Sequence, residues 1–206
     1  MRASVEIFSE VGGGSGTLIG ERGWVLTNWH VVTDPAGKDP SPAPVAIGVT
    51  LDLARPAVET FLAKVEKVDR VRDLALLRIV SGLYGQPLPE GFSFPHLESA
   101  PVGARPAIGD RLRLVGYPMT GGHGSREPIT VCEGIVSGYE RYAGFLRMKS
   151  DVTVAGGNSG GPALDGEGRI AAVATRYIQD EGGPGHLTYW VPWSEIPPGW
   201  LDRLRQ

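Results

Sequence analysis

The sequence predicts an all-β protein made of two six-stranded antiparallel β-barrels packed together, with a short C-terminal helix. Short apolar and β-branched runs recur along the 206 residues, and turn residues separate them, since the chain holds 30 glycines and 17 prolines. A Pro- and Gly-rich stretch over 83–106 divides these runs into two comparable sets. Short strands spaced by turn signals are typical of β-barrels and β-sandwiches.

The first set of runs is expected to form a barrel over about 1–82. Runs at 16–19 and 24–27 flank the turn signal Glu21-Arg22-Gly23, as the two strands of a hairpin would. The other strands of this barrel are expected at 45–51, 61–68 and 74–80.

The second set follows the linker over about 83–106 and is expected to form a barrel over about 107–192. Its strands are expected at 111–116, 129–137, 145–149, 170–175 and 187–191. Only the tail, over about 194–205, has helical character, and Ser194 is a candidate N-cap there. The prediction is therefore a single domain over 1–206.

Composition narrows the classes of function. The net charge is -3 without a basic block, so neither nucleic acid nor a membrane surface is an expected partner. Cys132 is the only cysteine, which excludes an intramolecular disulfide and a Cys-rich zinc site. No His/Asp/Glu spacing resembles a metal-ligand set, so no metal and no cofactor are expected.

The N-terminus carries no long apolar run, so we expect no signal peptide and a cytoplasmic location. A trimmed domain of an exported precursor is the alternative. No stretch approaches the roughly 20 apolar residues that a membrane span needs.

The segment 156–162 reads Gly-Gly-Asn-Ser-Gly-Gly-Pro and is the most informative stretch of the sequence about function. Glycines let the main chain approach a ligand more closely than a Cβ would permit. Backbone N–H groups around Ser159 are thus suited to hold a developing oxyanion, with the serine as nucleophile. A plain Gly-rich surface turn is the alternative interpretation of this segment alone.

A nucleophilic serine needs a base, and the base needs an orienting acid. Of the four histidines, His30 directly follows a strand-like run, where a buried core histidine is the alternative, and the others lie in expected loops: His96, His123 and His186. The acids considered are Asp69, Asp73, Asp110, Asp151 and Asp165. Asp73 opens an expected strand, Asp69 is equally suitable by composition, and Asp110 and Asp165 are typical turn formers.

Four motifs occur in an order that resembles the trypsin-like serine proteases, most closely the bacterial high-temperature-requirement (Deg) branch. They are Gly-Ser-Gly-Thr-Leu-Ile at 14–19, Val-Leu-Thr-Asn-Trp-His-Val-Val at 25–32, Asp-Leu-Ala-Leu-Leu at 73–77 and Gly-Asn-Ser-Gly-Gly-Pro at 157–162. The resemblance spans roughly residues 10–178, and the ordered set is far more specific than any one motif.

The resemblance implies a serine endopeptidase whose active site lies in the cleft between the two barrels. His30 would be the general base, Asp73 its orienting acid and Ser159 the nucleophile. The backbone N–H groups of Gly157 and Ser159 would form the oxyanion hole, and the substrate would be a peptide or protein.

Some features depart from the family pattern. Asn158 stands where trypsin has the aspartate that pairs with a new N-terminus, so we expect no zymogen activation of that kind. The chain leaves no room for the PDZ domain usual in the Deg branch, and a regulatory domain or partner outside this chain remains open.

The resemblance also places the primary substrate pocket, which contains no acid. A preference for small or medium aliphatic residues is therefore expected, although Arg176 is suited to recruiting an acidic residue instead. The expected pocket residues are Thr153, Val154, Ala155, Gly156, Ala174, Thr175 and Arg176.

Two other interpretations compete with the peptidase. The string Gly-x-Ser-x-Gly also fits the nucleophile elbow of an α/β-hydrolase, such as an esterase, but too little chain follows Ser159 for the remaining sheet, helices and histidine. The second is a catalytically silent or latent protease-fold binding module. All three triad residue types are retained, which argues against that module.

Overall fold

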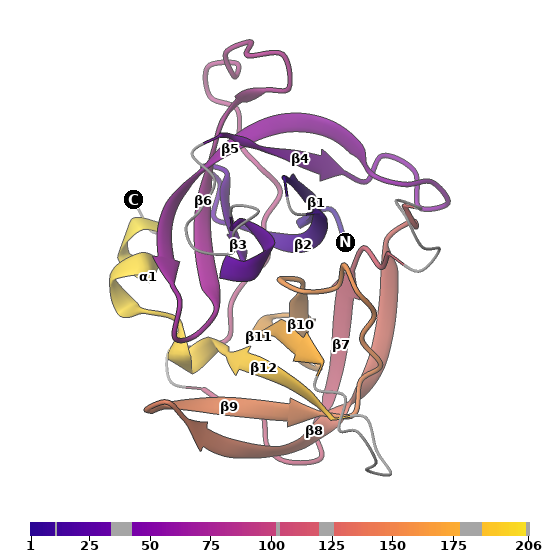
Figure 1. The fold of residues 1–206 in the computed structure, drawn as a ribbon, viewed down its shortest axis with the longest axis vertical. Helices are drawn as coiled ribbons and strands as arrows, with labels where there is room; N and C mark the ends of the chain where they lie inside the picture. The colour runs from indigo at the N-terminus through magenta and orange to yellow at the C-terminus, as the bar shows by residue number, and fades with distance from the viewer. Residues whose placement is uncertain (11, 34–42, 102–103, 120–125, 178–186, 205–206) are drawn as a thin grey trace.

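The computed structural model describes residues 1–10, 12–33, 43–101, 104–119, 126–177 and 187–204, which form two closed six-stranded antiparallel barrels, as expected (Figure 1). The strand order is β1-β2-β3-β6-β5-β4 in the first barrel and β10-β11-β12-β9-β8-β7 in the second. The first barrel comprises β1 (Ser4–Ser9), β2 (Gly12–Ile19), β3 (Trp24–Thr27), β4 (Val45–Val49), β5 (Val58–Asp69) and β6 (Leu74–Gly82). The second comprises β7 (Arg111–Gly116), β8 (Thr130–Tyr142), β9 (Phe145–Ser150), β10 (Pro162–Leu164), β11 (Ile170–Tyr177) and β12 (Thr188–Pro192).

The first barrel is closed by β1, a strand that the sequence expectation misses. It pairs with β2 on one side and β4 on the other, and its Val5 and Ile7 are fully buried. Between them Glu6 is also buried, and the guanidinium of Arg126 pairs with its carboxylate at 3.0 Å. Burial raises the pKa of Glu6, although Arg126 opposes that effect. Because successive residues of a strand point to opposite faces, Val5 and Ile7 face the barrel core while Glu6 lies on the outer face of β1, against Arg126.

The second barrel is closed by β10, which the sequence expectation also misses. It pairs with β11 and β7 but has only three residues, too few to show periodicity. Pro162 begins it, a position where a strand tolerates the missing N–H. Ser159 therefore lies immediately before the strand that closes this barrel.

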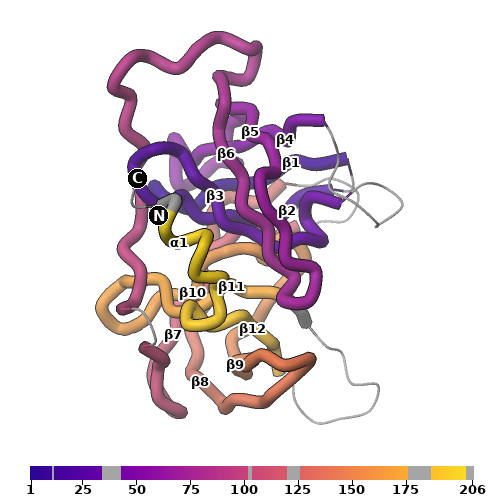
Figure 2. Tube along the Cα trace, turned by 90° about the vertical axis from the view of Figure 1, so that its left-hand side faces the viewer, coloured from indigo at the N-terminus to yellow at the C-terminus, as the bar shows by residue number. Residues whose placement is uncertain are grey.

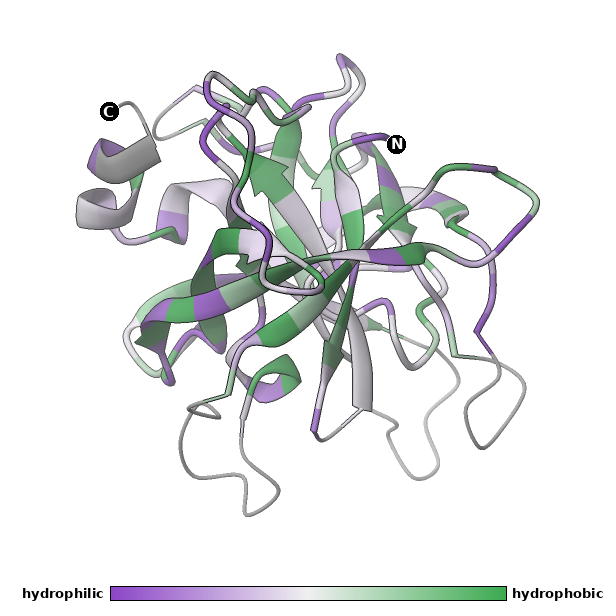
Figure 3. Cartoon of the chain, turned by 90° about the horizontal axis from the view of Figure 1, so that it is seen from above, coloured by the Kyte–Doolittle hydropathy of each residue, from purple (hydrophilic) through white to green (hydrophobic). Residues whose placement is uncertain are grey.

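The interface between the barrels is apolar. One cluster of buried residues draws on β2, β3 and β6 of the first barrel, on β7, β10, β11 and β12 of the second, and on the tail. Each barrel also has a core of its own. Figure 3 shows the hydrophobic colour concentrated on the strands. Because the cluster buries apolar surface from both barrels, it stabilises their docking.

The tail contributes the only α-helix among the described residues, α1 (Pro198–Leu204), which is shorter than the expected 194–205. Trp193–Glu195 form a 3-10 turn instead, and Pro198 occupies the first helical position, which proline favours. Figure 2 shows α1 beside the barrels, and Trp200 is buried in the interface cluster. No helix in the described ranges has the length and apolar character to cross a membrane.

Candidate active site

His30 and Asp73 meet through two hydrogen bonds. The Nδ1–H of His30 donates to Asp73 Oδ2 at 2.7 Å, and its backbone N–H donates to Oδ1 at 3.0 Å. His30 lies in the short 3-10 helix η1 (Trp29–Val31), which follows β3 directly. A carboxylate on Nδ1–H fixes the tautomer, so the lone pair of Nε2 is left to accept a proton.

Asp73 is held in an unusual backbone conformation. Its φ is +56°, in the left-handed region, at the turn between β5 and β6. A non-glycine residue there costs on the order of 1–3 kcal/mol, and such residues cluster at functional sites. The side-chain amide of Asn28 donates to the Asp73 carbonyl at 2.8 Å, which helps to hold this conformation. Only 13% of the Asp73 side chain is exposed, against 33% for His30.

Hydrogen bonds through Thr175 connect Ser159 to the residues around the His30–Asp73 pair. The Ser159 hydroxyl donates to the carbonyl of Thr175 at 3.1 Å, and the Thr175 hydroxyl accepts from Asn28 Nδ2 at 3.4 Å. Contacts therefore run from Ser159 through Thr175 and Asn28 to Asp73. No hydrogen bond between Ser159 Oγ and His30 is present among the described residues, because the hydroxyl donates to the Thr175 carbonyl instead.

Four carbonyls fix the backbone around the serine. Gly156 accepts from Met119 N–H at 2.7 Å and Asn158 from Gly161 N–H at 3.0 Å. The Gly157 carbonyl accepts from the Ser15 hydroxyl at 2.7 Å, and the Ser159 carbonyl accepts from the Ser15 N–H at 2.8 Å. The N–H and C=O of a trans peptide point in opposite directions. The N–H groups of Gly157 and Ser159 therefore point away from Met119 and Gly161, and neither donates to a described residue.

Two glycines make this backbone possible. Gly157 has φ +91° and Gly160 has φ +86°, a conformation that residues with a Cβ rarely adopt. A Cβ on Gly157 would collide with the Tyr117 carbonyl, and one on Gly160 would collide with Thr27 and the Ser15 carbonyl. Gly160 thereby lets the serine loop touch the strand that leads to His30.

The other residues considered at the sequence level have separate tasks. Asp69 accepts two hydrogen bonds of 2.9 Å from Arg72, one from its backbone N–H and one from its guanidinium. Asp69 is therefore paired with Arg72, whereas Asp73 is paired with His30. Asp110 accepts from Ala107 N–H in a turn, as expected, and Asp151 accepts from Ile135 N–H. His96 contacts the Phe94 carbonyl, while His123 and His186 lie outside the described residues.

The expected pocket residues are only partly described. Val154 packs against the core cluster that contains Ala174, so these two segments lie close together. Thr153 and Gly156 are exposed, Ala155 is half-buried and its carbonyl accepts from Asn158 N–H, and the Arg176 side chain lies outside the described residues.

A cavity of about 180 Å³ borders Asp73 and Thr175. Its lining includes Asp73 and Thr175 together with aromatic and arginine side chains: Trp29, Arg70, Arg72, Tyr142, Phe145, Arg147, Tyr189 and Trp190. The Arg147 guanidinium lies over the Tyr142 and Tyr189 rings, 3.7 and 4.6 Å from their centroids. Asp73 therefore borders a small cavity that is lined by aromatic and arginine side chains.

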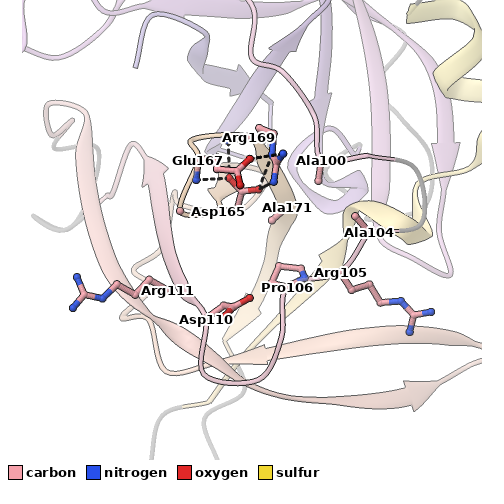
Figure 4. Close-up of a pocket in the computed structure, with 11 residues that line it drawn as sticks. Ala100, Ala104, Arg105, Pro106, Asp110, Arg111, Asp165, Glu167, Arg169 and Ala171 are labelled. Atoms are coloured by element: carbon pink, nitrogen blue, oxygen red, sulfur yellow. Dashed lines mark hydrogen bonds and ion pairs between the residues drawn. The ribbon is translucent and has the colours of Figure 1, made fainter.

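A larger cavity, of about 350 Å³, lies on the second barrel (Figure 4). Asp165, Glu167 and Arg169 form ion pairs there, while Arg105 and Arg111 point outward. Burial raises the pKa of Asp165, but hydrogen bonds from Arg169 and Glu167 outweigh it and hold the pKa below its ordinary value. None of the described residues that line this cavity is a serine, cysteine or histidine, so it holds no serine–histidine or cysteine–histidine pair.

The sequence analysis gave no role to Ser15 or Asn28, and it placed Thr175 in the substrate pocket rather than between Ser159 and Asn28. Ser15 and Asn28 both lie in the matched motifs, beside the glycines and directly before Trp29-His30. Their position in those motifs was the available signal. The described residues contain no group of three or more His, Cys, Asp or Glu side chains suited to a metal.

A histidine–aspartate pair on one β-barrel, facing a Gly-rich serine loop on a second, is the arrangement of trypsin-like peptidases. The model of the trypsin-like peptidase domain family matches residues 14–173, and this chain belongs to that family. It is related to the Deg branch, as the sequence resemblance indicates.

Named relatives agree with this assignment. The chain is 28% identical over 171 residues to Protease Do-like 8, chloroplastic, of Arabidopsis thaliana, covering 77% of this chain and 34% of that protein. It is 32% identical over 184 residues to the putative serine protease HhoA of Synechocystis, covering 84% and 39%. The chain thus spans little more than a third of the length of these relatives.

A solved structure, the serine endoprotease from Yersinia pestis, shares the fold. The TM-score is 0.69 at 22% identity, with 98% of this chain and 62% of that chain covered.

Proposed function

We propose that this protein is a serine endopeptidase, with His30 as general base, Asp73 as the acid that orients it and Ser159 as nucleophile. The observation that carries the proposal is the Nδ1–H bond from His30 to Asp73 in a site that Ser159 also reaches. Family membership and relatives named as serine proteases support it. A binding module has no functional need for an aspartate in a strained backbone conformation that is hydrogen-bonded to a histidine.

The mechanism follows from these groups. Ser159 Oγ attacks the peptide carbonyl carbon while His30 Nε2 takes the hydroxyl proton. The N–H groups of Gly157 and Ser159, which have no acceptor among the described residues, stabilise the oxyanion. His30 returns the proton to the leaving amine as the C–N bond breaks. Water, deprotonated by His30, then hydrolyses the acyl-enzyme and regenerates Ser159.

The test is labelling with a serine-reactive phosphonate, with Ser159→Ala as the matched control. The proposal predicts covalent labelling of the parent protein that disappears in S159A. Well-folded parent protein that neither labels nor cleaves peptides would instead support a silent binding module.

We further propose that the cleaved bond follows a small or medium aliphatic residue. The expected pocket segments contain no acid, and the half-buried Val154 is the apolar side chain there that is partly exposed. A peptide library read by mass spectrometry checks this preference. Cleavage confined to sites after Arg or Lys would contradict it, and cleavage after Asp or Glu would favour recruitment by Arg176. The cytoplasmic location stays a prediction.

A further inference from the structure

The side chain of Ser15 makes two hydrogen bonds next to the nucleophile loop. Ser15 lies on β2 of the first barrel and is fully buried. Its hydroxyl donates to the Gly157 carbonyl at 2.7 Å and accepts from Tyr117 N–H at 2.9 Å. Its backbone N–H donates to the Ser159 carbonyl at 2.8 Å, and its own carbonyl accepts from Thr27 Oγ1 at 2.7 Å. Every polar group of Ser15 is therefore engaged.

These bonds act on the nucleophile loop from the opposite barrel. Two of the four carbonyls at 156–159 are held by Ser15, those of Gly157 and Ser159. The third, that of Gly156, is held by Met119, which lies two residues after Tyr117, itself a donor to Ser15. A single hydroxyl thus connects the loop to the segment that orients the Gly157 N–H.

We propose that Ser15 is a positioning residue whose hydroxyl, through Tyr117 and Met119, keeps the Gly157 N–H aimed at the substrate oxyanion. The inference rests on the proposed peptidase function and deepens it. Without the hydroxyl, the Gly157 carbonyl loses its donor and the buried Tyr117 N–H loses its acceptor. The glycines at 156 and 157 permit rotation of the peptide planes, so the loop then samples orientations in which the Gly157 N–H is misdirected.

This assignment predicts a specific kinetic effect. Ser15 touches no substrate atom, so KM of Ser15→Ala should stay within about threefold, whereas kcat should fall by about 10- to 100-fold because oxyanion donors are misplaced. Affinity for a peptide aldehyde should fall in parallel with kcat/KM. The aldehyde carbon gains a bond to Ser159 Oγ, its oxygen becomes the oxyanion, and the serine proton moves to His30. A role confined to folding would lower thermal stability without this selective loss.

Ser4→Ala is the matched control. Ser4 is a buried serine of the same barrel, and its hydroxyl has no partner among the described residues. Ser15→Cys, which keeps a weak S–H donor, should lie between wild type and S15A in kcat. Circular dichroism verifies that each variant is folded, and if S15A does not fold, S15C is compared with S4A.

The outcomes separate the two proposals. Wild-type protein without labelling or cleavage means that the peptidase proposal fails. An active wild type in which folded S15A or S15C matches S4A in both kcat and aldehyde affinity overturns the role of Ser15. A selective loss of kcat and aldehyde affinity, with partial rescue in S15C, supports it.

Discussion

His30 and Asp73 are held almost entirely by groups of their own barrel, whereas the Ser159 loop depends on the opposite one. Among the described residues the carboxylate of Asp73 accepts only from His30, and the Asp73 carbonyl accepts from Asn28, two residues earlier in the chain than His30. The loop, by contrast, has two of its four carbonyls at 156–159 bound to Ser15. The acid–base half can thus form with the first barrel, while the nucleophile half requires both barrels to be docked.

Asp73→Asn should have the largest effect, because it breaks the acid–base half. An asparagine cannot hold the His30 tautomer that leaves Nε2 free, so kcat should fall by about 10⁴-fold with the fold retained. Peptide hydrolysis measures this loss.

Asp69→Asn is the control for Asp73→Asn, because Asp69 binds Arg72 rather than His30. It should keep kcat, and the lost ion pair should cost no more than about 1 kcal/mol of unfolding free energy. Equal losses of activity in the two variants would contradict the assignment of Asp73.

Gly157→Ala should damage the nucleophile half. Its φ of +91° and the contact of a new Cβ with the Tyr117 carbonyl force the backbone to move. Loss of that oxyanion donor should lower kcat by about 10²- to 10³-fold. Gly166→Ala, at an open position in the β10–β11 turn, is the control. Unchanged kcat in G157A would show that this backbone geometry is not required.

Asn158→Asp tests the buried surroundings of the same loop. Asn158 is 3% exposed, and its Oδ1 has no partner among the described residues. A carboxylate there is desolvated and unpaired, so its pKa is raised and unfolding free energy at pH 7 should fall by about 3 kcal/mol. A raised acid pKa means that the loss shrinks as the pH falls through it. Urea unfolding at several pH values measures this, and equal stability at pH 7 would contradict it.

The expectation that Asn158 excludes trypsin-style activation has its own test. Removing residues from the N-terminus should not increase activity. An N-terminal truncation that switched activity on would contradict this expectation.

Tyr117→Phe should affect stability rather than catalysis, because it removes the two hydrogen bonds of a hydroxyl that joins the barrels. The Tyr117 hydroxyl donates to the Ser4 carbonyl at 2.8 Å and contacts Thr50 Oγ1 at 2.7 Å. Their loss should cost about 1–2 kcal/mol of unfolding free energy at pH 7.

The alkaline range isolates the contribution of Tyr117. Burial raises its pKa to about 12, an effect that the Thr50 hydrogen bond opposes. Because the folded pKa exceeds the ordinary value of 10, this stabilisation is complete below pH 10 and is lost as the pH rises towards 12. Absorbance titration of tyrosinate should show a late group that Y117F lacks, while Tyr139, whose pKa burial also raises, is present in both proteins. A wild-type protein in which every tyrosine ionises near pH 10 would contradict this.

The sequence predicted the longer strands, and it missed β1 and β10, the two short strands that close the barrels. β1 carries the buried Glu6, whose partner Arg126 comes 120 positions later in the chain. β10 has three residues and is defined by its neighbours rather than by its own periodicity. In both cases the missing information is a contact distant in sequence.

The same limit applies to the site. Ordered motifs pointed to His30, Asp73 and Ser159, but composition alone did not separate Asp73 from Asp69. That choice depends on a turn in which one aspartate faces Arg72 and the other faces His30. Ser15 and Gly157 are 142 positions apart, and no local pattern links them before the barrels pack.

The most direct test of the account is a double-mutant cycle across the two halves, measured as kcat/KM for His30→Ala, Ser159→Ala and the double variant. Residues that act as one catalytic unit give strongly non-additive losses. The account predicts that the double variant is no slower than the slower single variant, because removing either residue already abolishes nucleophilic attack. Losses that multiply in the double variant would show that His30 and Ser159 act independently, and would contradict the account.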